Sequence, residues 1–293
     1  MQVVVFGKYM KEKNIPYIQE LLDVLHAKHI NVYIYAPYFK QFKDQIKFQK
    51  DVGVFEGYLD LKVKKIDFLI CLGGDGTILE AVTVIMDQHV PILGINLGRL
   101  GFLASIDKGT IETAINQLCE DRFSLEERTM LFLESDKNLF GDVKIALNDF
   151  TILKRDTSSM ISISAYINGA YLATYWADGI ILSTPTGSTG YNLSCGGPII
   201  FPDSGNFVLT PVAPHNLNIR PIVISDESIV SFEVEGRAEN FLCTLDSRFE
   251  TISSVDELAI RKNDYNIKLV QLPNKSFLST MREKLAWGQD SRN

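Results

Sequence analysis

The fold is decided by residues 66–85, IDFLICLGGDGTILEAVTVI. The first seven residues are apolar apart from Asp67, as in a parallel strand that is covered on both faces. Ile78, Val82 and Ile85 then recur at helical spacing. The turn GGDGT at 73–77 therefore joins a buried strand to a helix. That places it at the carboxyl edge of a parallel sheet, where such folds bind ligands.

The preceding and following segments repeat this alternation of strand and helix. Residues 3–6, 32–36 and 90–97 are further apolar runs, and residues 14–29 show an amphipathic pattern for which Asn14 is a suitable N-cap. We therefore predict βαβ units and an α/β N-terminal domain with a parallel sheet. The apolar residues of the predicted helix at 14–29 are Ile15, Ile18, Leu22 and Leu25.

Beyond about residue 122 the hydrophobic period changes to two. Residues 161–167 and 230–235 largely alternate apolar and polar side chains, which is typical of half-buried antiparallel strands. Asn168-Gly169 follows the first of these runs and favours a two-residue hairpin turn. The second domain is therefore predicted to be all-β.

The last part of the chain returns to a helical pattern. Residues 277–287 are expected to form a helix whose apolar side chains pack back on the first domain. The predicted division is an α/β domain at 1–122, a β-rich domain at 123–270 and a helical tail at 271–293.

Composition excludes several classes of protein. The 293 residues are 46% apolar with a formal charge of −7, and Lys and Arg are scattered, which argues against a nucleic-acid-binding surface. The four cysteines form no Cys-x-x-Cys pair, so neither a zinc site nor a disulfide framework is indicated. No signal-peptide pattern and no membrane-spanning run are present. We expect a cytoplasmic protein that binds neither nucleic acid nor membranes.

The GGDGT turn combines glycines with one carboxylate. Backbone N–H groups at a helix start can hold phosphate oxygens when no side chain obstructs them. Asp75 is unusual there, because an anion beside bound phosphates costs electrostatic energy unless it accepts a proton or helps to hold a metal ion. From the pentapeptide alone, a helix-capping role for Asp75 is an equally good interpretation.

Residues 178–198, DGIILSTPTGSTGYNLSCGGP, offer many hydroxyls and glycines with one aromatic residue, Tyr191. This composition suits hydrogen bonding to a base and its sugars, with Tyr191 available for stacking. An ordinary loop is the alternative, but unstructured loops of this length are uncommon unless they are functional. Ser188 is not a hydrolase nucleophile by motif, because Gly-x-Ser-x-Gly requires glycine where Thr186 stands. Walker A and Gly-x-Gly-x-x-Gly sequences are absent.

Asn148-Asp149 follows a short apolar run. An amide beside a carboxylate could read an adenine edge and ribose hydroxyls, although on its own this dipeptide more often marks a turn. The four histidines show no His-Glu-x-x-His spacing, and His26 and His29, near a helix C-terminus, are expected to be solvated.

Taken in order, these motifs resemble those of the NAD kinases. GGDGT at 73–77 resembles the family's catalytic turn, and residues 96–103 are similar to its NxGxLGFL segment. Asn148-Asp149 stands where the family has Asn-Glu, and residues 178–198 resemble its DG…TPTGSTAY…GGP signature. Residues 214–221 are similar to its PHxLxxRP element.

The resemblance implies a β-sandwich-like C-terminal domain and a site between the two domains. Asp75 would take the proton of the 2′-hydroxyl of the adenosine ribose of NAD as that hydroxyl attacks the γ-phosphate of ATP. A divalent cation, Mg²⁺ or Mn²⁺, would accompany ATP, and no resident metal site is expected. The phosphate-binding residues would be Gly73, Gly74, Gly76 and Thr77.

The resemblance also assigns the NAD-binding residues. Asn148, Thr186 and Thr189 would read the adenine, Asp149 its ribose, and Asp178 and Ala213 would face the nicotinamide end. Tyr191 and Ser194 would line the pocket, and a homodimer or homotetramer is implied. The remaining expected contacts to NAD are Asp75, Gly76, Gly190, Asn192, Leu193 and Arg248.

Three positions depart from the family pattern. Asp149 replaces glutamate and is one methylene shorter, so that its ribose contact would need a small shift or a water. Gly190 replaces alanine and loosens the loop. Asp246-Ser247-Arg248 stands where DGQ is common, and Arg248 is a candidate for an added phosphate contact.

Two alternatives to NAD phosphorylation stay open at this level. A lipid kinase of the diacylglycerol type shares the GGDGT turn but has no use for the nucleotide-directed chemistry of TPTGSTGY at 184–191. A pyridine-nucleotide sensor would bind the same ligand without transferring phosphate.

Overall fold

The chain forms two compact units. The computed structural model describes residues 1–155, 159–273 and 275–288. The first unit is Met1–Glu127 with the chain from Ile267 onward, and the second is Arg128–Asn266. Residues 274 and 289–293 of the predicted helical tail lie outside the described residues.

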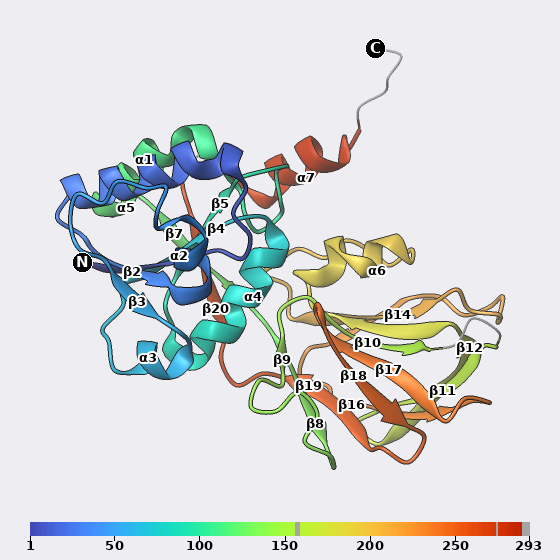
Figure 1. The fold of residues 1–293 in the computed structure, drawn as a ribbon. Coiled ribbons are helices and arrows are strands. Elements are labelled where there is room, and N and C mark those ends of the chain that lie inside the picture. Colours follow the sequence, from blue (N-terminus) through green and yellow to red (C-terminus); the bar gives the residue numbers. More distant parts are fainter. Residues whose placement is uncertain (156–158, 274, 289–293) are drawn as a thin grey trace. The chain divides into compact units, whose positions relative to one another are not determined.

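The first unit is built on one large, mostly parallel sheet with the strand order β3-β2-β1-β4-β5-β20-β7, and β6 adds to β5 (Figure 1). The order of the strands departs from their order in the chain at β1. This strand pairs in parallel with β2 on one side and with β4 on the other. The strands are β1 (Gln2–Phe6), β2 (Asn31–Tyr35), β3 (Gly53–Phe55), β4 (Phe68–Leu72), β5 (Ile92–Asn96), β6 (Ile106–Asp107), β7 (Ser124–Arg128) and β20 (Ile267–Gln271).

Helices cover both faces of this sheet. On β5, Leu93 and Ile95 point into a core that α1 and α5 also enter. Gly94 between them points the other way, where an added Cβ would lie 2.6 Å from Ile78 Cδ1 on α4. Period-two alternation in the strand thus separates two helical layers. The helices are α1 (Ile15–Ala27), α2 (Ala36–Phe42), α3 (Tyr58–Lys62), α4 (Asp75–Ile85), α5 (Ile111–Cys119) and α7 (Phe277–Leu285).

The order of the strands creates a ligand-binding edge. Connections from β1 run to one side of the sheet and those from β4 to the other, so the strand order reverses between β1 and β4. Open parallel sheets bind ligands beyond the carboxyl ends of the strands at such a point. Gly73 and Gly74 follow β4 directly at this edge and lead into α4. The predicted strand, turn and helix at 66–85 are confirmed.

The second unit consists of two antiparallel sheets with the orders β15-β14-β13-β10-β17-β18 and β12-β11-β16-β19-β8-β9. Phe150 of the first sheet stacks on Phe232 of the second with ring centroids 5.7 Å apart, so the sheets pack face to face. The prediction of an all-β, sandwich-like fold is confirmed. Its strands are β8 (Leu131–Ser135), β9 (Ile145–Ala146), β10 (Asp149–Lys154), β11 (Ile161–Ile167), β12 (Ala170–Ala177), β13 (Gly179–Ser183), β14 (Asn206–Val212), β15 (Ile222–Ser225), β16 (Val230–Glu235), β17 (Asn240–Leu245), β18 (Arg248–Ser253) and β19 (Leu258–Lys262).

The hairpin between β11 and β12 has the predicted turn chemistry. Asn168 and Gly169 have φ angles of +51° and +81°. Both central residues of a type I′ turn need positive φ, which asparagine and glycine tolerate best. The turn therefore lets β11 pair with β12 in the register that buries Ile161 and Ile163.

The C-terminal helix packs on the first unit, as predicted. Ser276 and Ser279 form a reciprocal capping box at the start of α7. The Phe277 ring lies 5.9 Å from the Phe102 ring, in the loop that follows β5. This contact brings the end of the chain to the carboxyl edge of the sheet.

Two local expectations were wrong. Asn14 stands at the N-cap position of α1, but its side chain makes no capping hydrogen bond and is itself buried. His26 is only 3% exposed, because it lies one turn after Leu22 on the inner face of α1. Burial lowers the pKa of His26; His29, which follows the helix, is exposed as expected.

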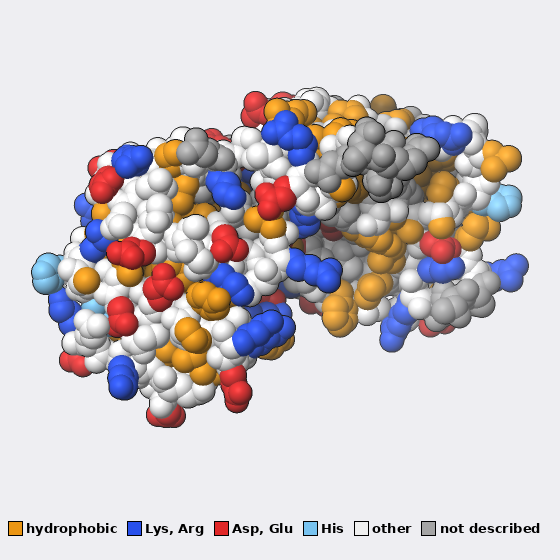
Figure 2. Space-filling model, turned by 90° about the horizontal axis from the view of Figure 1, so that it is seen from above, with side chains coloured by type: hydrophobic (Ala, Val, Ile, Leu, Met, Phe, Trp, Pro, Cys, Tyr) orange, Lys and Arg blue, Asp and Glu red, His pale blue; other side chains and the backbone are white. Residues whose placement is uncertain are grey.

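Charged side chains are interspersed on the surface. On the face shown in Figure 2, Lys and Arg are scattered among acidic and uncharged side chains rather than gathered into one basic face. Among the described residues, no helix combines the length and the apolar character that crossing a membrane would require.

Candidate active site

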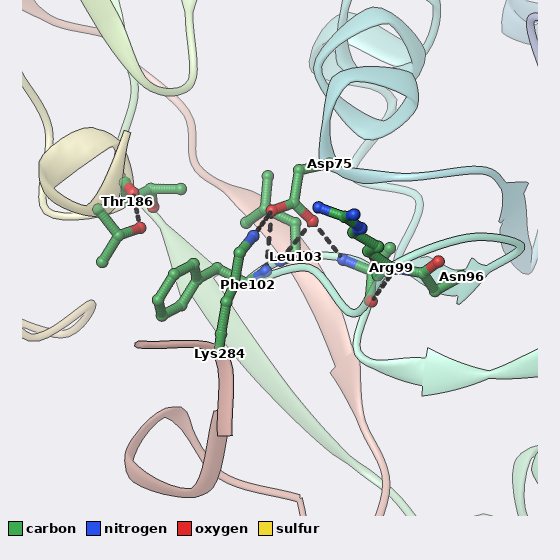
Figure 3. Close-up of polar contacts among 9 residues, drawn as sticks. Asp75, Asn96, Arg99, Phe102, Leu103, Thr186 and Lys284 are labelled. Carbon is green, nitrogen blue, oxygen red and sulfur yellow. Dashed lines mark hydrogen bonds and ion pairs between the residues drawn. The ribbon is translucent and has the colours of Figure 1, made fainter. Parts of the chain in front are cut away.

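The Asp75 carboxylate is held by the loop after β5. Asp75 is the first residue of α4, whose N-cap position is Gly74, and no side chain of the described residues caps this helix. The helix-capping interpretation of Asp75 is therefore wrong. Its Oδ2 accepts a hydrogen bond from the Phe102 backbone N–H at 2.8 Å, and its Oδ1 accepts from Leu103 and Ala104, each at 3.0 Å (Figure 3).

Asn96 shapes the loop that supplies these donors. Its Oδ1 accepts from the Gly98 N–H at 2.5 Å, and its Nδ2 donates to the carbonyls of Arg99 and Ala104. Asn96 is nearly fully buried at the end of β5. A single buried amide thus folds residues 97–104 back so that their N–H groups face the start of α4.

The glycines of the GGDGT turn differ in what surrounds them. A Cβ at Gly73 would lie 2.1 Å from Thr77 Oγ1, so Gly73 is required by packing within the turn. Gly74 and Gly76 have nothing within 4 Å of an added Cβ, and both are exposed. Neither has a positive φ. Their lack of a side chain is therefore not needed by the fold, and it leaves the helix start open to a ligand.

Unused donors lie at the same place. Among the described residues, no acceptor is recorded for the backbone N–H groups of Asp75 and Gly76 in the first turn of α4. The first N–H groups of a helix have no intrahelical partner and, with the helix dipole, favour an anion. Of the predicted phosphate-binding residues, Gly76 thus presents a free donor beside that of Asp75. The Gly73 N–H is bonded to the Ile95 carbonyl at 3.0 Å and the Thr77 N–H to the Gly74 carbonyl at 2.9 Å.

One cation from the end of the chain reaches the same carboxylate. Lys284 Nζ on α7 lies 3.4 Å from Asp75 Oδ2 and 4.8 Å from the centroid of the Phe102 ring. Figure 3 shows the lysine side chain pointing at the carboxylate that the loop already holds. Residues 75 and 284 are far apart in sequence, so motif reading gave no signal for this pair.

In the second unit, two predicted segments meet. Thr184 donates its N–H to the Asn148 carbonyl at 2.9 Å and its hydroxyl to the Leu147 carbonyl at 2.6 Å. Asp149 pairs with Ser183 in the register of β10 and β13. A Cβ at Gly187 would lie 2.1 Å from the Asn148 carbonyl oxygen. The structure therefore brings Asn148 and Asp149 against the hydroxyl-rich segment.

A third predicted segment supports these two from behind. The Asp246 carboxylate accepts hydrogen bonds from the backbone N–H groups of Leu147, Asn148 and Asp149 at 2.9, 2.8 and 3.1 Å. The Arg248 guanidinium donates to the carbonyls of Val143 and Ile145. Asp246 and Arg248 thus both support the backbone of residues 143–149. The Nη1 and Nη2 atoms of Arg248 each donate to a backbone carbonyl in these contacts.

The buried carboxylates have perturbed pKa values. Burial raises the pKa of Asp149 to about 7, and the nearby negative charge of Asp246 adds to this effect. Burial also raises the pKa of Asp246, which its three backbone donors oppose. Asp149 is only 7% exposed, and no hydrogen bond to its carboxylate is recorded among the described residues. A ligand with hydroxyl donors would supply the missing partners.

Two residues of the hydroxyl-rich segment serve the fold. Ser188 donates to the Pro185 carbonyl at 2.6 Å and accepts from the Ile200 N–H at 3.0 Å. Asn192, predicted to contact NAD, is fully buried; its amide donates to the carbonyls of Ser188 and Pro198 and accepts from the Thr210 hydroxyl at 2.6 Å. Both side chains shape residues 185–200.

Most other members of the segment are at least partly accessible, although Thr186 is buried. Tyr191 is 39% exposed, and burial of the rest of its ring raises its pKa, to which Asp149 and Asp178 also contribute. Thr189 bonds the Thr186 carbonyl at 3.3 Å. Three further predicted residues have these environments: Thr186 accepts from Arg128 at 3.3 Å, Leu193 is half-buried, and Ser194 is exposed.

Asp178 and Ala213 lie at the opposite end of β13 from Thr184. Asp178 precedes β13 and Ala213 follows β14. The Asp178 N–H donates a hydrogen bond to the Val212 carbonyl at 2.9 Å, which holds these two positions together. Asp178 forms an ion pair with Lys154 at 2.6 Å. Ala213 is exposed and has a φ of +45°, which is uncommon for a residue with a Cβ and is often stabilised at functional sites. The five residues of β13 separate the two ends by roughly 16 Å.

No protein-built metal cage accompanies these residues. Within residues 1–155, 159–273 and 275–288, no group of three or more His, Cys, Asp or Glu side chains is placed to hold a metal ion. The carboxylate donor set at Asp75 is a single residue. A cation here would take most of its ligands from a bound phosphate chain and water, as Mg²⁺ commonly does.

Sequence reasoning missed several supporting residues. The donors at Phe102, Leu103 and Ala104 are backbone N–H groups, which carry no side-chain signature. Asp246 differs from the family pattern only as part of Asp246-Ser247-Arg248, and that departure does not reveal that its carboxylate organises residues 147–149. The available signal was the Asp-Ser pair at 246–247, two residue types that favour tight turns. In the structure these residues form the turn between β17 and β18, where Asp246 has a φ of +53°.

Comparison with known proteins matches both halves of the chain. Residues 3–123 match the ATP-NAD kinase N-terminal domain, and residues 147–272 match the ATP-NAD kinase C-terminal domain. The chain is 47% identical to the NAD kinase of Cytophaga hutchinsonii over 290 residues, covering 98% of each chain. It is 42% identical to the NAD kinase of Christiangramia forsetii over 295 residues, covering 100% of each.

Solved structures agree with this assignment. A crystal structure of yeast NADH kinase complexed with NADH matches 99% of this chain and 88% of the yeast chain, with a TM-score of 0.88 and 25% identity. An NAD kinase from Archaeoglobus fulgidus in complex with ATP shares the fold, with a TM-score of 0.74 and 23% identity over 98% of this chain and 99% of the other. The lipid kinase hypothesis used only the GGDGT turn, whereas these matches extend over the whole length. The chain belongs to the NAD kinase family.

Proposed function

We propose that this protein transfers the γ-phosphate of ATP to the 2′-hydroxyl of the adenosine ribose of NAD, giving NADP and ADP. The observation that carries the proposal is the position of the Asp75 carboxylate. It stands at the carboxyl edge of a parallel sheet beside open, glycine-lined N–H donors, and it does not cap its own helix. A carboxylate beside a phosphate-binding turn suits proton acceptance from an attacking hydroxyl.

In the proposed reaction, the 2′-oxygen forms a bond to the γ-phosphorus. The bond from that phosphorus to the β,γ-bridging oxygen breaks, and its electron pair leaves with ADP. The hydroxyl proton passes to a carboxylate oxygen of Asp75. Gly74, Gly76 and Thr77 hold the phosphate chain at the start of α4, where the first-turn N–H groups favour negative charge; Gly73 keeps the turn tight.

We propose that Mg²⁺ or Mn²⁺ enters as a complex with ATP. A divalent cation on the triphosphate would neutralise part of the charge that develops during transfer. Because the described residues offer no carboxylate cluster, phosphate oxygens and water would supply most of the ligands. The role left to the protein is to orient the phosphate chain and to keep Asp75 in place.

The second unit is proposed to bind NAD. The buried carboxylate of Asp149, which has no partner in the described part of the chain, suits the ribose hydroxyls, and the Asn148 amide suits an adenine edge. Tyr191, exposed on one side, would stack on the ligand. Asp178 and Ala213, at the far end of β13, are assigned to the nicotinamide end. Further contacts are assigned to Thr186, Thr189, Gly190, Leu193 and Ser194, while Asn192 and Arg248 support the pocket through the backbone.

Incubation with NAD, ATP and Mg²⁺ tests the proposal directly. We expect NADP, measured with an NADP-specific dehydrogenase, in amounts that rise with enzyme concentration. The Asp75→Asn variant is the matched control for contaminating activity. If folded protein binds NAD but forms no NADP with ATP or with another nucleoside triphosphate, the sensor hypothesis replaces the kinase.

We also propose assembly into a homodimer or homotetramer. β12 is the edge strand of its sheet, and Tyr171 and Trp176 on it are 61% and 55% exposed. Exposed aromatic side chains on a strand edge favour association. Light scattering after size exclusion measures the mass, and a value near 33 kDa at micromolar concentration would contradict the proposal.

A further inference from the structure

The hydrogen bonds to Asp75 leave no lone pair for a substrate. A carboxylate has about four acceptor positions, two on each oxygen. Oδ1 accepts from Leu103 and Ala104, and Oδ2 accepts from Phe102 and interacts with Lys284. A general base must come within hydrogen-bond distance of the hydroxyl whose proton it takes. One of these four donors therefore has to leave before Asp75 can act.

The three backbone donors are poorly placed to leave. They belong to a loop that the buried Asn96 amide folds back, and Gly101 lies against the carboxylate so closely that a Cβ there would be 1.8 Å from Oδ1. Their distances of 2.8 to 3.0 Å are those of well-formed hydrogen bonds.

Lys284 differs from the three backbone donors in its distance from the carboxylate and in its freedom to move. Its Nζ is 3.4 Å from Oδ2, the longest of the four contacts, and its side chain is 35% exposed. Its flexible stem crosses the Phe102 ring, over which the ammonium lies at 4.8 Å from the centroid. An exposed ammonium on a four-carbon stem can swing several ångströms without moving its helix.

The transferred phosphate would come within reach of this ammonium. In the proposed reaction, which this inference rests on, the 2′-oxygen lies about 3 Å from Asp75. The phosphorus lies about 3 to 3.5 Å from that oxygen. Phosphoryl oxygens thus approach the position that Lys284 occupies. They carry more negative charge than a carboxylate that already accepts three N–H donors, so they compete effectively for the lysine.

We propose that Lys284 passes from Asp75 to the γ-phosphate when ATP binds. In the free enzyme it occupies the fourth acceptor position of Asp75 and balances its charge. In the complex with both substrates it binds a phosphoryl oxygen and releases the lone pair that accepts the 2′-hydroxyl proton. The C-terminal helix α7 thereby supplies a phosphate-binding residue to a site built around the GGDGT turn.

The test compares Lys284→Met, Lys284→Arg and the control Arg282→Gln, with kcat and the KM of each substrate measured separately. Methionine keeps the apolar stem over Phe102 but removes the charge. Arg282 lies on the same helix and is exposed; within the described part of the chain, the Asp75 carboxylate is bonded by Phe102, Leu103, Ala104 and Lys284 and not by Arg282. Lys284→Gln serves the same purpose if Lys284→Met does not fold.

For Lys284→Met we expect kcat to fall by at least about tenfold and the KM of ATP to rise by at least about threefold, because a charge-assisted phosphate contact is lost. The KM of NAD should stay within about twofold. Lys284→Arg should recover most of the loss, and Arg282→Gln should match the wild type.

Wild-type values in Lys284→Met would overturn the inference. So would a fall in kcat with an unchanged KM of ATP, because the lysine would then act only through Asp75. A rise in the KM of ATP that Lys284→Arg does not correct would also overturn it. If the wild-type protein itself makes no NADP, the proposed function fails, which is a different result.

Discussion

Gly101 leaves no space for a side chain beside Asp75. A Cβ at Gly101 would lie 1.8 Å from Asp75 Oδ1 and 2.6 Å from its Cγ. No real Cβ tolerates such a contact, so the loop and the carboxylate fit together only when residue 101 is glycine. The φ of Gly101 is not in the left-handed region, so the requirement is steric and not conformational.

Gly101→Ala should therefore displace the loop from Asp75. We expect the loss of some of the hydrogen bonds from Phe102, Leu103 and Ala104, a fall in the unfolding free energy of about 1 to 3 kcal/mol, and a large loss of kcat. Thermal unfolding and steady-state kinetics measure these effects. Gly57→Ala is the matched control, since an added Cβ there meets nothing within 4 Å. Equal stability of the two variants would contradict the prediction.

Gly76→Ala separates ligand binding from folding. Gly76 lies in the first turn of α4 with open space around an added Cβ, so alanine should raise helix stability by up to about 1 kcal/mol. The same methyl group would obstruct phosphate approach, and the KM of ATP should rise at least about tenfold. Differential scanning calorimetry and kinetics give the two values. A variant that binds ATP normally would remove Gly76 from the phosphate site.

Asp75→Asn tests the proposed base. We expect NAD to bind with nearly unchanged affinity while turnover falls by at least about a hundredfold. The amide group would also face at least one backbone N–H of the loop, which should lower the unfolding temperature by a few degrees. NAD binding by calorimetry shows whether the pocket survives. Unchanged turnover would refute the role of Asp75.

The raised pKa of Asp149 predicts a pH-dependent stability. Its folded-state pKa is about 7, above the ordinary value of 3.8, so the folded protein holds this proton more tightly than the unfolded chain does. The contribution of Asp149 to stability is therefore largest at low pH and falls as the pH rises from about 4 to about 7.

Asp149→Asn removes this titration. Relative to the wild type, the unfolding temperature of Asp149→Asn should increase between pH 5 and about pH 7 and level off above that, whatever its offset at pH 5. Thermal melts in a series of buffers at constant ionic strength measure the difference. Parallel curves for the two proteins would mean that Asp149 has an ordinary pKa.

Arg248→Met should weaken the backbone support of the NAD pocket. It removes charge-assisted hydrogen bonds to the carbonyls of Val143 and Ile145 and takes a positive charge away from the half-buried Asp246. We expect a loss of about 2 to 4 kcal/mol in unfolding free energy and a higher KM of NAD. Arg237→Met, at an exposed arginine in the same unit, is the control. A rise in the KM of ATP alone would favour a direct phosphate contact of Arg248.

Much of the fold follows from local patterns. The strand, turn and helix at 66–85 were predicted, and so was a helix at 14–29, which the structure forms over Ile15–Ala27. Apolar residues at helical spacing, or a fully apolar run, are typical of these elements. The alternation at 161–167 and 230–235 predicted β11 and β16, and Asn168-Gly169 predicted the hairpin turn that joins β11 to β12. His26 was misjudged because a position near a helix end says little about which face it lies on.

The sequence by itself determined the chemistry available: a carboxylate among glycines, a hydroxyl-rich segment, an amide beside a carboxylate. Only the tertiary structure decided how these groups are held. Asp75 is bonded by backbone N–H groups about 28 residues away and approached by Lys284, and Asp246 supports the backbone at Asn148. Backbone donors have no residue signature, and contacts between distant segments depend on how strands and helices pack, which no local pattern records.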